Sequence, residues 1–494
     1  SMPIVTVNIG NETKTFPVVY GTRLMDLFID HRIDTGGTCG GKGICNKCLV
    51  GIVGTRNETL ACHYYVTNDV TVSIKSRQSK PIYNSMPTVY ESTVTEGFGV
   101  AIDLGTTTIA MYLYDLKTNM LKDSCSFLNP QAIYGADVIS RIDKCLSGFL
   151  LAETEIVIQA INQQIIQWLS VFSITEISRI VIAGNPTMLH IIANVNPGTI
   201  GSAPYTPVFL ETKTLMGKEC GLLSEKIILL PSISAFIGAD LSAGMISSGM
   251  LEAETSLLID MGTNGEIILK KRDFYFGCST ATGPAFEGAN IEKGLGGIKG
   301  AIARVTFNTG KLAFETIGNQ PPIGICGSGL VDLVAILVSE GIIDETGAFC
   351  HNSQSQLANH LDADRFMLLN DIYLTQKDVR QFQLAKSAIC AGIETLLNAA
   401  NVDVDAVNKV FVAGGFGFYL NLDNALKIGL LPKVFHGRII SVGNTSGLGA
   451  AMCLLNPEKI KQVQELALKV QTIDLMTKEF GFTERFIENM MFSI

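Results

Sequence analysis

The hydrophobic pattern of the first 75 residues predicts a small unit built mainly of strands. Pro3–Ile9 alternates β-branched apolar residues with polar ones, and a Gly-Asn turn separates it from a second run of the same kind. A short helix follows, because Leu24, Leu27 and Phe28 are spaced to share one face. The predicted elements are strands at 3–9, 14–19, 48–53 and 70–74, and one helix that is capped by Thr22.

Beyond this unit the pattern changes twice. Residues 76–97 are rich in Ser, Thr, Pro and Gln and lack apolar periodicity, which predicts a linker. From residue 98 onward, apolar strand-like runs alternate with long helical patterns such as 154–172 and 377–400. This alternation predicts an α/β architecture.

An internal repeat divides this larger part of the chain. Val100-Ala-Ile-Asp-Leu-Gly-Thr-Thr-Thr108 is echoed by Leu257-Leu-Ile-Asp-Met-Gly-Thr-Asn-Gly265, and Ile180-Val-Ile-Ala-Gly-Asn185 is echoed by Val410-Phe-Val-Ala-Gly-Gly415. Each half therefore has a strand ending in Asp-x-Gly-Thr, helical material, and a strand ending in Ala-Gly. We expect two related α/β lobes, at about 98–255 and 256–455, with a cleft between them and a C-terminal helical tail.

Composition and charge narrow the possible functions. Hydrophobic residues make up 47% and charged residues 17% of the 494 positions, which allows large buried cores. The net charge of −9 argues against broad binding to nucleic acid or acidic membranes. Four prolines interrupt the uncharged stretch 180–210, so we expect no membrane-spanning helix there. The first residues lack the charged and then apolar pattern of a secretion signal, so we expect a soluble, cytoplasmic protein.

Four of the twelve cysteines fall close together in a glycine-rich loop. Cys39, Cys45, Cys48 and Cys62 have the spacing C-x5-C-x2-C-x13-C. Plant-type iron–sulfur sites use C-x4-C-x2-C with a distant fourth cysteine, so this loop is one residue longer and its fourth cysteine comes early. Glycine suits such a loop because it adopts positive φ angles and lets backbone amides approach the sulfurs. We interpret the cysteines as ligands of a [2Fe–2S] cluster; a structural zinc site and uncoordinated thiols are the alternatives.

The two Asp-x-Gly-Thr turns are candidate phosphate sites. Their backbone amides and hydroxyls can hold phosphate oxygens, and the acid can hold Mg²⁺ or orient the attacking water. One such turn is weak evidence, because hairpins favour these residues on conformational grounds. Two copies, each followed by an Ala-Gly strand end, are stronger evidence. Glu287, in a glycine-rich segment, is a further candidate acid, with a helix-start carboxylate as the alternative.

Both parts resemble known folds. Residues 3–75, with Thr59-Leu-Ala-Cys62 as the segment that presents the last ligand, resemble the ferredoxin-like β-grasp domains. Residues 98–455 resemble the superfamily of actin, Hsp70 chaperones, sugar kinases and acetate kinase, whose duplicated, two-lobed ATPase domain is ribonuclease H-like. This resemblance implies that ATP binds in the cleft. It assigns the first phosphate loop to Asp103, Gly105, Thr106 and Thr107, the second to Asp260, Gly262, Thr263 and Asn264, the adenosine loop to Gly414, Gly415 and Phe416, and connecting segments to Gly327, Ser328 and Asn444.

A [2Fe–2S] domain followed by an actin-like ATPase resembles the reductive activators of corrinoid proteins. The segments at 129–142, 184–190, 281–289 and 325–332 also look like that family. The resemblance implies that the protein transfers one electron from its cluster to Co(II), which restores Co(I) for methyl transfer, and that MgATP drives this unfavourable step. It implies a corrinoid protein and an external low-potential electron donor as partners, and it is compatible with a homodimer. Longer family members carry an extra domain where this chain has only residues 76–97.

Three other functions share parts of this pattern. Activators of other low-potential metalloenzymes, such as 2-hydroxyacyl-CoA dehydratases, use a [4Fe–4S] cluster shared between subunits and lack an N-terminal ferredoxin domain. A redox-sensing ATPase or chaperone would combine a cluster with an ATPase, but residues 457–494 predict helices and no peptide-binding β-domain. A sugar kinase has no need of the cluster. The sequence therefore favours the corrinoid activator.

Overall fold

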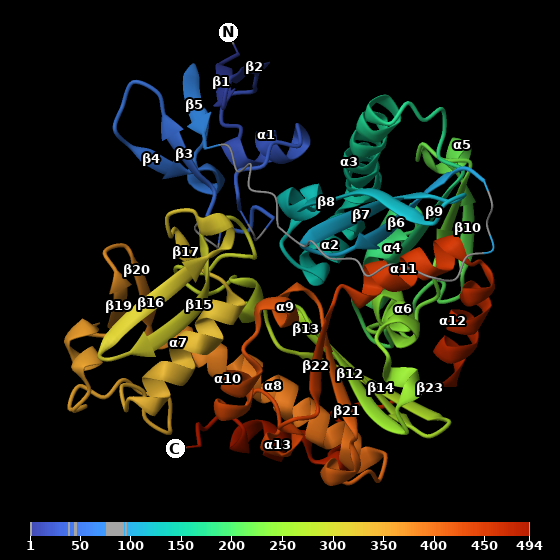
Figure 1. The fold of residues 1–494 in the computed structure, drawn as a ribbon. Helices are drawn as coiled ribbons and strands as arrows, with labels where there is room; N and C mark the ends of the chain where they lie inside the picture. The colour runs from blue at the N-terminus through green and yellow to red at the C-terminus, as the bar shows by residue number, and fades with distance from the viewer. Residues whose placement is uncertain (1, 38–39, 44–46, 76–92, 94–95, 494) are drawn as a thin grey trace.

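The computed structural model describes residues 2–37, 40–43, 47–75, 93 and 96–493. The predicted linker at 76–97 lies mostly outside this range. Figure 1 shows three parts: an N-terminal unit in blue, a sheet with helices in cyan and green, and a larger part from yellow-green to red.

The N-terminal unit is a five-stranded sheet with one helix packed against it. The strand order is β2-β1-β5-β3-β4, in which β1 pairs antiparallel with β2 and parallel with β5. Alternate residues of the sheet, Val5 and Val72 among them, pack with Leu24 and Phe28 of the helix, and all four are fully buried. The elements are β1 (Ile4–Ile9), β2 (Glu12–Pro17), α1 (Leu24–Asp30), β3 (Leu49–Ile52), β4 (Glu58–Leu60) and β5 (Val70–Ile74).

The start of α1 differs from the prediction. Thr22 is not the capping residue, because its hydroxyl donates a hydrogen bond to the carbonyl of Val19 at 2.7 Å. Arg23 holds the cap position, and its side chain makes no capping hydrogen bond. The expected cap is therefore wrong, although the apolar face of the helix is as predicted.

The first half of the repeat forms a six-stranded sheet in the order β10-β11-β9-β6-β7-β8. Helix α11 (Thr445–Leu455) returns from late in the chain to pack against β6 and β9 (Figure 1). The other elements are β6 (Phe98–Leu104), β7 (Thr108–Asp115), β8 (Met120–Leu128), α2 (Val138–Lys144), α3 (Leu150–Val171), β9 (Arg179–Gly184), α4 (Pro186–Ile192), β10 (Lys213–Met216), α5 (Gly217–Cys220), β11 (Lys226–Leu229) and α6 (Ala239–Ser247).

The stretch Val138–Val171 is long and apolar enough, by length and composition, to cross a membrane. Gly148 interrupts its helical geometry, and one face of α3, with Ile161, Ile165 and Trp168, is buried against the first sheet. Glu153 and Thr154 are also buried within it. We interpret the stretch as a core helix, because its apolar face already has a partner within the protein.

The second half forms a matching sheet in the order β22-β21-β12-β13-β14-β23. Its last strand comes from the region predicted as a helical tail and pairs parallel with β14. Two three-stranded sheets, β16-β15-β17 and β18-β19-β20, are attached to this part. The elements are β12 (Thr255–Met261), β13 (Asn264–Lys271), β14 (Phe274–Ala281), β15 (Ala301–Asn308), β16 (Lys311–Thr316), β17 (Gly324–Ile325), α7 (Gly327–Ser339), β18 (Leu361–Asp362), β19 (Arg365–Leu369), β20 (Ile372–Thr375), α8 (Gln376–Ala399), β21 (Lys409–Ala413), α9 (Gly415–Tyr419), α10 (Leu422–Lys427), β22 (Ile439–Gly443), α12 (Glu458–Lys469), β23 (Val470–Thr472) and α13 (Phe482–Glu488).

The registers of the two sheets show that the repeat is structural. β6 runs parallel to β9 with Asp103 opposite Ala183, and β12 runs parallel to β21 with Asp260 opposite Ala413. Each acid therefore lies beside an Ala-Gly strand end, as the sequence repeat predicted. The carboxyl ends of these parallel strands form one edge of each sheet, which is where ligands bind in open α/β sheets.

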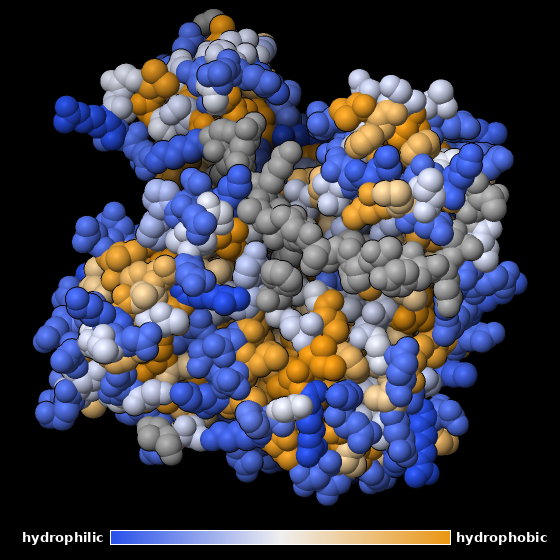
Figure 2. Space-filling view, viewed as in Figure 1, coloured by the Kyte–Doolittle hydropathy of each residue, from blue (hydrophilic) through white to orange (hydrophobic). Residues whose placement is uncertain are grey.

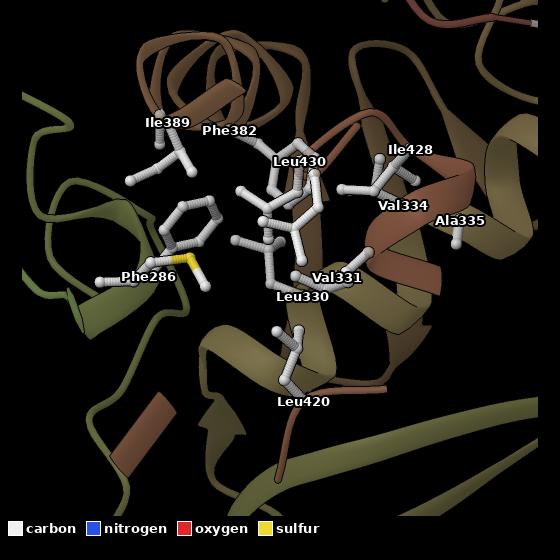
Figure 3. Packing of buried hydrophobic residues seen from close by; sticks show 14 of the residues in the cluster. Phe286, Leu330, Val331, Val334, Ala335, Phe382, Ile389, Leu420, Ile428 and Leu430 are labelled. Carbon is white, nitrogen blue, oxygen red and sulfur yellow. The ribbon is translucent and has the colours of Figure 1, made fainter. Parts of the chain in front are cut away.

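The largest apolar core lies under the second sheet, between α7 and α8. Figure 3 shows Phe286 among Leu330 and Val331 of α7, with Phe382 and Ile389 of α8 nearby. Phe286 also lines the cleft between the two six-stranded sheets. Because the core continues up to Phe286, this side of the cleft is apolar and closely packed. On the face drawn in Figure 2, hydrophilic residues dominate the rim, and apolar residues gather toward the lower centre.

Candidate functional site

A cleft between the two six-stranded sheets brings the predicted nucleotide residues together. The residues that line it come from both halves of the repeat and from the two connecting segments. They include Asp103, Gly105, Thr106, Thr107, Asp260, Gly262, Thr263, Asn264, Glu287, Gly327, Ser328, Gly414, Phe416 and Asn444. Gly415, which has no side chain, begins α9 directly after Gly414.

Both predicted phosphate loops are tight turns between antiparallel strands. In the first, the amide of Gly105 donates to the carbonyl of Thr108 at 3.0 Å, and a Cβ on Gly105 would lie only 2.4 Å from that oxygen. In the second, the amide of Gly262 donates to the carbonyl of Asn264 at 3.1 Å. The glycine of the first turn is therefore required by close packing. The second turn is one residue shorter than the first, because Leu104 pairs with Ile109 whereas Met261 pairs with Gly265.

Side chains from neighbouring elements hold the first loop in place. The Asn185 amide donates to the hydroxyl of Thr106 at 2.9 Å, while its oxygen caps α4 by accepting from the amide of Met188. The hydroxyl of Ser446 donates to the carboxylate of Asp103 at 2.9 Å. The loop therefore depends on α4 and α11, one from each end of the domain.

The buried acids of the cleft form a repelling group. Burial raises the pKa of Asp103 to about 7, opposed by the Ser446 hydrogen bond and assisted by the charge of Asp260. Burial is also the main cause of the raised pKa values of Asp240, Asp260 and Glu287, and the charges of neighbouring acids contribute at Asp240 and Glu287. Carboxylates packed in this way favour either protonation or a bound cation.

Two of these acids, Asp240 and Asp260, have the geometry of a cation site together with Glu266. Ligand oxygens of Asp240, Asp260 and Glu266 lie within 4.8 Å of one another, and oxygen ligands are those that Mg²⁺ prefers. Glu266 lies opposite Asp260 across the β12–β13 hairpin. Burial raises the pKa of Glu266 well above its ordinary value, and the charges of Asp240 and Asp260 add to this effect.

Two of these acids were missed by sequence reasoning. Counting back across the second hairpin from the Gly-Thr turn would have placed Glu266 beside Asp260. Asp240 begins α6 and has no counterpart in the two motifs, so only the tertiary fold reveals it. Glu287, which was predicted, lies in a short 3-10 helix and accepts a hydrogen bond from the hydroxyl of Thr263.

The adenosine segment opens α9 at the end of β21. Gly414 has a φ of 91°, and a Cβ there would lie 3.1 Å from a carboxylate oxygen of Asp260. The ring of Phe416 stacks on that of Phe286, with centroids 4.8 Å apart. The close approach of backbone and acid at Gly414 joins the adenosine segment to the second phosphate loop.

The connecting residues make structural hydrogen bonds while they line the cleft. Ser328 donates its hydroxyl to the carbonyl of Ala303 at 2.7 Å. Asn444 caps α11 and donates to the hydroxyl of Tyr112 at 3.0 Å. These side chains therefore fix the relative position of the elements that border the cleft.

The described part of the cysteine loop frames a buried site. Cys48 and Cys62 are 2% and 4% exposed, and the amide of Ala61 donates to the carbonyl of Cys48 at 2.8 Å, which joins their segments. The carbonyl of Gly41 accepts from the Arg23 guanidinium at 2.7 Å. Cys39 and Cys45 lie outside the described residues. The two described cysteines are thus in place on adjoining segments.

The burial of the cleft acids predicts a specific pH dependence of stability. A carboxyl whose pKa is raised on folding stabilises the fold fully below its unfolded pKa and loses that contribution as pH rises through the folded value. For Asp103, this loss runs from about pH 4 to about pH 7. We expect the melting temperature without divalent cations to fall over this range, and Mg²⁺ to raise it by about 2 °C or more at pH 8 but little at pH 5. Differential scanning fluorimetry measures both; an equal effect of Mg²⁺ at the two pH values would contradict the expectation.

Comparison with known proteins separates the alternatives. Residues 254–494 match the family model described as the C-terminal domain of RACo, the ASKHA domain, and residues 98–253 match the RACo middle region. A protein of Eubacterium limosum named corrinoid activation enzyme RamQ is 31% identical, covering 92% of this chain and 93% of its own length. The chain belongs to the family of corrinoid reductive activators. The family predicted from the motifs is therefore confirmed, as is the α/β fold class with an actin-like ATPase domain.

Two further relatives agree with this family. A Methanosarcina barkeri protein named [Co(II) methylated amine-specific corrinoid protein] reductase is 26% identical and covers 77% of this chain and 74% of its own length. A solved structure named reductive activator for corrinoid, iron–sulfur protein is 27% identical, covers 99% of this chain and 98% of that chain, and has a TM-score of 0.75. The similarity therefore extends over the N-terminal unit as well as both halves of the repeat.

Proposed function

We propose that this protein reductively activates a corrinoid protein, with ATP hydrolysis driving the transfer of one electron from a [2Fe–2S] cluster to Co(II). The observation that supports the proposal is that one chain holds both two buried cysteines beside a glycine-rich loop and a cleft lined by two acid-bearing hairpin turns. The corrinoid activation enzyme and the solved reductive activator match over 92% and 99% of this chain and thus over both parts.

Cys39, Cys45, Cys48 and Cys62 would hold the cluster. The burial of Cys48 and Cys62 supports this, since a cluster shielded from water keeps a low potential. Gly40, Gly41 and Gly43 have positive φ angles, which glycine adopts without strain and which suit a loop that wraps a cluster. When bound, the cluster supplies a one-electron donor near ~−400 mV if it behaves as plant-type clusters do.

The cleft would hold MgATP. Amides and hydroxyls of the two hairpin loops (Gly105–Thr107 and Gly262–Asn264) are suited to the phosphates, and Gly414–Phe416 to the adenosine. Asp103, Asp260 and Glu287 are the proposed catalytic acids, and Asp240 and Glu266 add to the negative charge that attracts the cation. Binding of Mg²⁺ offsets the repulsion among these buried carboxylates.

ATP is needed because the family resemblance places the Co(II)/Co(I) couple below the cluster potential. Each ~59 mV of one-electron mismatch lowers the equilibrium constant about tenfold. Closure of the two sheets around ATP supplies the energy if it favours one state of the corrinoid partner. The donor that reduces the cluster, a homodimer, the cytoplasmic location and the division into 1–75, 76–97 and 98–494 remain predictions.

Phe416 offers a test of the adenosine assignment. We expect Phe416→Leu to raise the Kd for MgATP about tenfold, because it removes the ring that stacks on Phe286. The Kd for inorganic triphosphate should stay within about threefold of wild type, because phosphates bind at the hairpins. Isothermal titration calorimetry measures both constants, and an equal loss for the two ligands would contradict the assignment.

ATP turnover in the presence of the partner tests the function as a whole. The anaerobic protein is incubated with MgATP and a methylamine-type Co(II) corrinoid protein, and phosphate release is followed. We expect turnover to rise when the corrinoid protein is added and to show no such rise with hexoses. Sugar phosphorylation, or ATP turnover indifferent to the corrinoid protein, would overturn the proposal.

A further inference from the structure

A line of buried polar contacts leads away from the back of the first phosphate loop. The side-chain amide of Asn129 donates to the carbonyl of Gly105 at 2.9 Å and to the oxygen of Gln131 at 3.0 Å. The backbone amide of Asn129 donates to the carbonyl of Thr107 at 2.8 Å. Asn129 and Gln131 are each 1% exposed. The loop and the segment that follows β8 are therefore tied together out of contact with water.

Gln131 is the junction of this line. Its side-chain amide donates to the carbonyl of Glu153 at 3.1 Å, and its oxygen accepts from Arg141 at 3.3 Å. Arg141, itself 1% exposed, also donates to the carbonyl of Gly135 at 2.9 Å. One glutamine side chain thus connects the phosphate loop, the start of α3 and the turn at Gly135.

The carboxylate of Glu153 is the least satisfied member of this group. One of its oxygens accepts from the Cys145 thiol at 2.9 Å. The other is buried and has no hydrogen-bond partner within the part of the chain that the structure describes. Buried polar networks with an unmet member are sensitive to small displacements, because each remaining bond is strong in a low-dielectric surrounding.

The segment 129–135 also forms part of the surface against which the N-terminal unit packs. A Cβ on Gly40 would lie 2.6 Å from the carbonyl oxygen of Tyr134, so the cysteine loop and the 129–135 segment touch through their backbones. Lys42 pairs with Asp143 at 3.2 Å. Ile133 and Tyr134 belong to the apolar cluster that contains Cys48 and Cys62. In Figure 1 the blue unit accordingly sits beside α2 and α3.

We propose that Gln131 is a positioning residue that couples nucleotide binding at the first phosphate loop to Gly40–Gly43 of the cysteine loop. This inference rests on the proposed function, because it requires ATP in the cleft and a cluster at the cysteines. A shift of Gly105 on nucleotide binding moves Asn129 and Gln131, and packed interiors pass such a shift on as a rigid displacement. Tyr134 then moves against Gly40, which has no side chain that could adjust to the shift.

Such a displacement would change the surroundings of the cluster. Hydrogen bonds to the sulfurs and exposure to solvent set the potential of iron–sulfur centres. Coupling is reciprocal, so the redox state of the cluster must change the affinity for nucleotide by the same factor. Through this network, ATP binding would act on the cluster, which donates the electron, as well as on the corrinoid partner, which accepts it.

Hydrogen–deuterium exchange of the anaerobic holoprotein tests this inference. Exchange at amides 40–43 is measured with and without a non-hydrolysable MgATP analogue, and Kd is measured for the oxidised and reduced protein. In wild type we expect exchange at these amides and Kd each to change by about threefold or more. Gln131→Met, which keeps the volume but removes all three hydrogen bonds, should keep cluster content and analogue binding and lose both responses.

Gln383→Met is the matched control. Gln383 is 2% exposed, and its side-chain amide donates to the carbonyls of Thr346 and Met490, which lie in the C-terminal part of the chain and not in the segments that contact the cysteine loop. It should retain both responses. A wild-type loop indifferent to a bound analogue overturns the coupling even if Gln131→Met fails to fold, and a normal response in Gln131→Met overturns the role of Gln131. Failure of wild type to bind the analogue overturns the proposed function itself.

Discussion

Replacing Asp260 with asparagine should lower ATP turnover by about a hundredfold or more, which is the loss typical of removing one preorganised charged group from a transition state. Asp260 is the residue before the last of β12 and lies with Asp240 and Glu266 at the candidate cation site. Asparagine keeps its shape but not its charge, so the site would hold Mg²⁺ less firmly. Steady-state phosphate release measures the change.

The same substitution should stabilise the protein in the absence of Mg²⁺. The charge of Asp260 contributes to the raised pKa values of Asp103 and Asp240, so its removal relieves repulsion among buried acids. We expect a melting temperature about 2 °C or more above wild type at pH 8, where these carboxyls are ionised in wild type.

Asp332→Asn is the matched control for both effects. Asp332 is 3% exposed and accepts from the amide of Val305 and the side chain of Asn424, but it is not one of the residues that line the cleft. Its replacement should lower the melting temperature and leave the Kd for MgATP within about threefold of wild type. If both variants lose ATP turnover equally, the assignment of Asp260 to the catalytic group is wrong.

The second large effect concerns the cysteines. Cys48→Ser and Cys62→Ser should each abolish the cluster, because an oxygen ligand in place of a thiolate matches iron poorly and both positions are buried. The variants should be colourless, lack the visible absorption and electron paramagnetic resonance of the reduced cluster, and lose Co(II) reduction. Binding of MgATP should persist, since these cysteines do not line the cleft.

Cys390→Ser controls for the loss of a buried thiol. Cys390 is 3% exposed and donates to Glu394 at 3.2 Å, a bond that serine can keep. It should retain iron, colour and reduction. Wild-type protein that binds zinc and no iron would instead support the alternative of a structural zinc site.

Most of the fold can be predicted from the sequence because short, contiguous motifs encode the repeat. The Asp-x-Gly-Thr turns end β6 and β12, where a buried apolar strand meets residues suited to a tight turn. The Ala-Gly ends of β9 and β21 can be predicted for the same reason, because each follows a buried apolar strand. The cap of α1 could not be predicted, since a threonine hydroxyl can bond either a helix amide or a nearby backbone carbonyl, and that of Thr22 donates to Val19.

The site could be predicted where it lies on motifs and not where it depends on tertiary contact. The two hairpin loops and the adenosine segment converge as expected. Asp240 joins them only because α6 begins beside β12, and Gln131 only because the segment after β8 folds behind Gly105. Single residues in otherwise apolar segments leave no periodic pattern, so their positions become visible only in three dimensions.

Reduction of the corrinoid partner is the most direct measurement of the central claim. Anaerobic protein, a low-potential reductant and a Co(II) corrinoid protein are mixed with and without MgATP, and the absorbance of Co(I) is recorded. The account predicts Co(I) with ATP, little without it, and none with Cys48→Ser. Equal Co(I) formation in the presence and absence of ATP would contradict it.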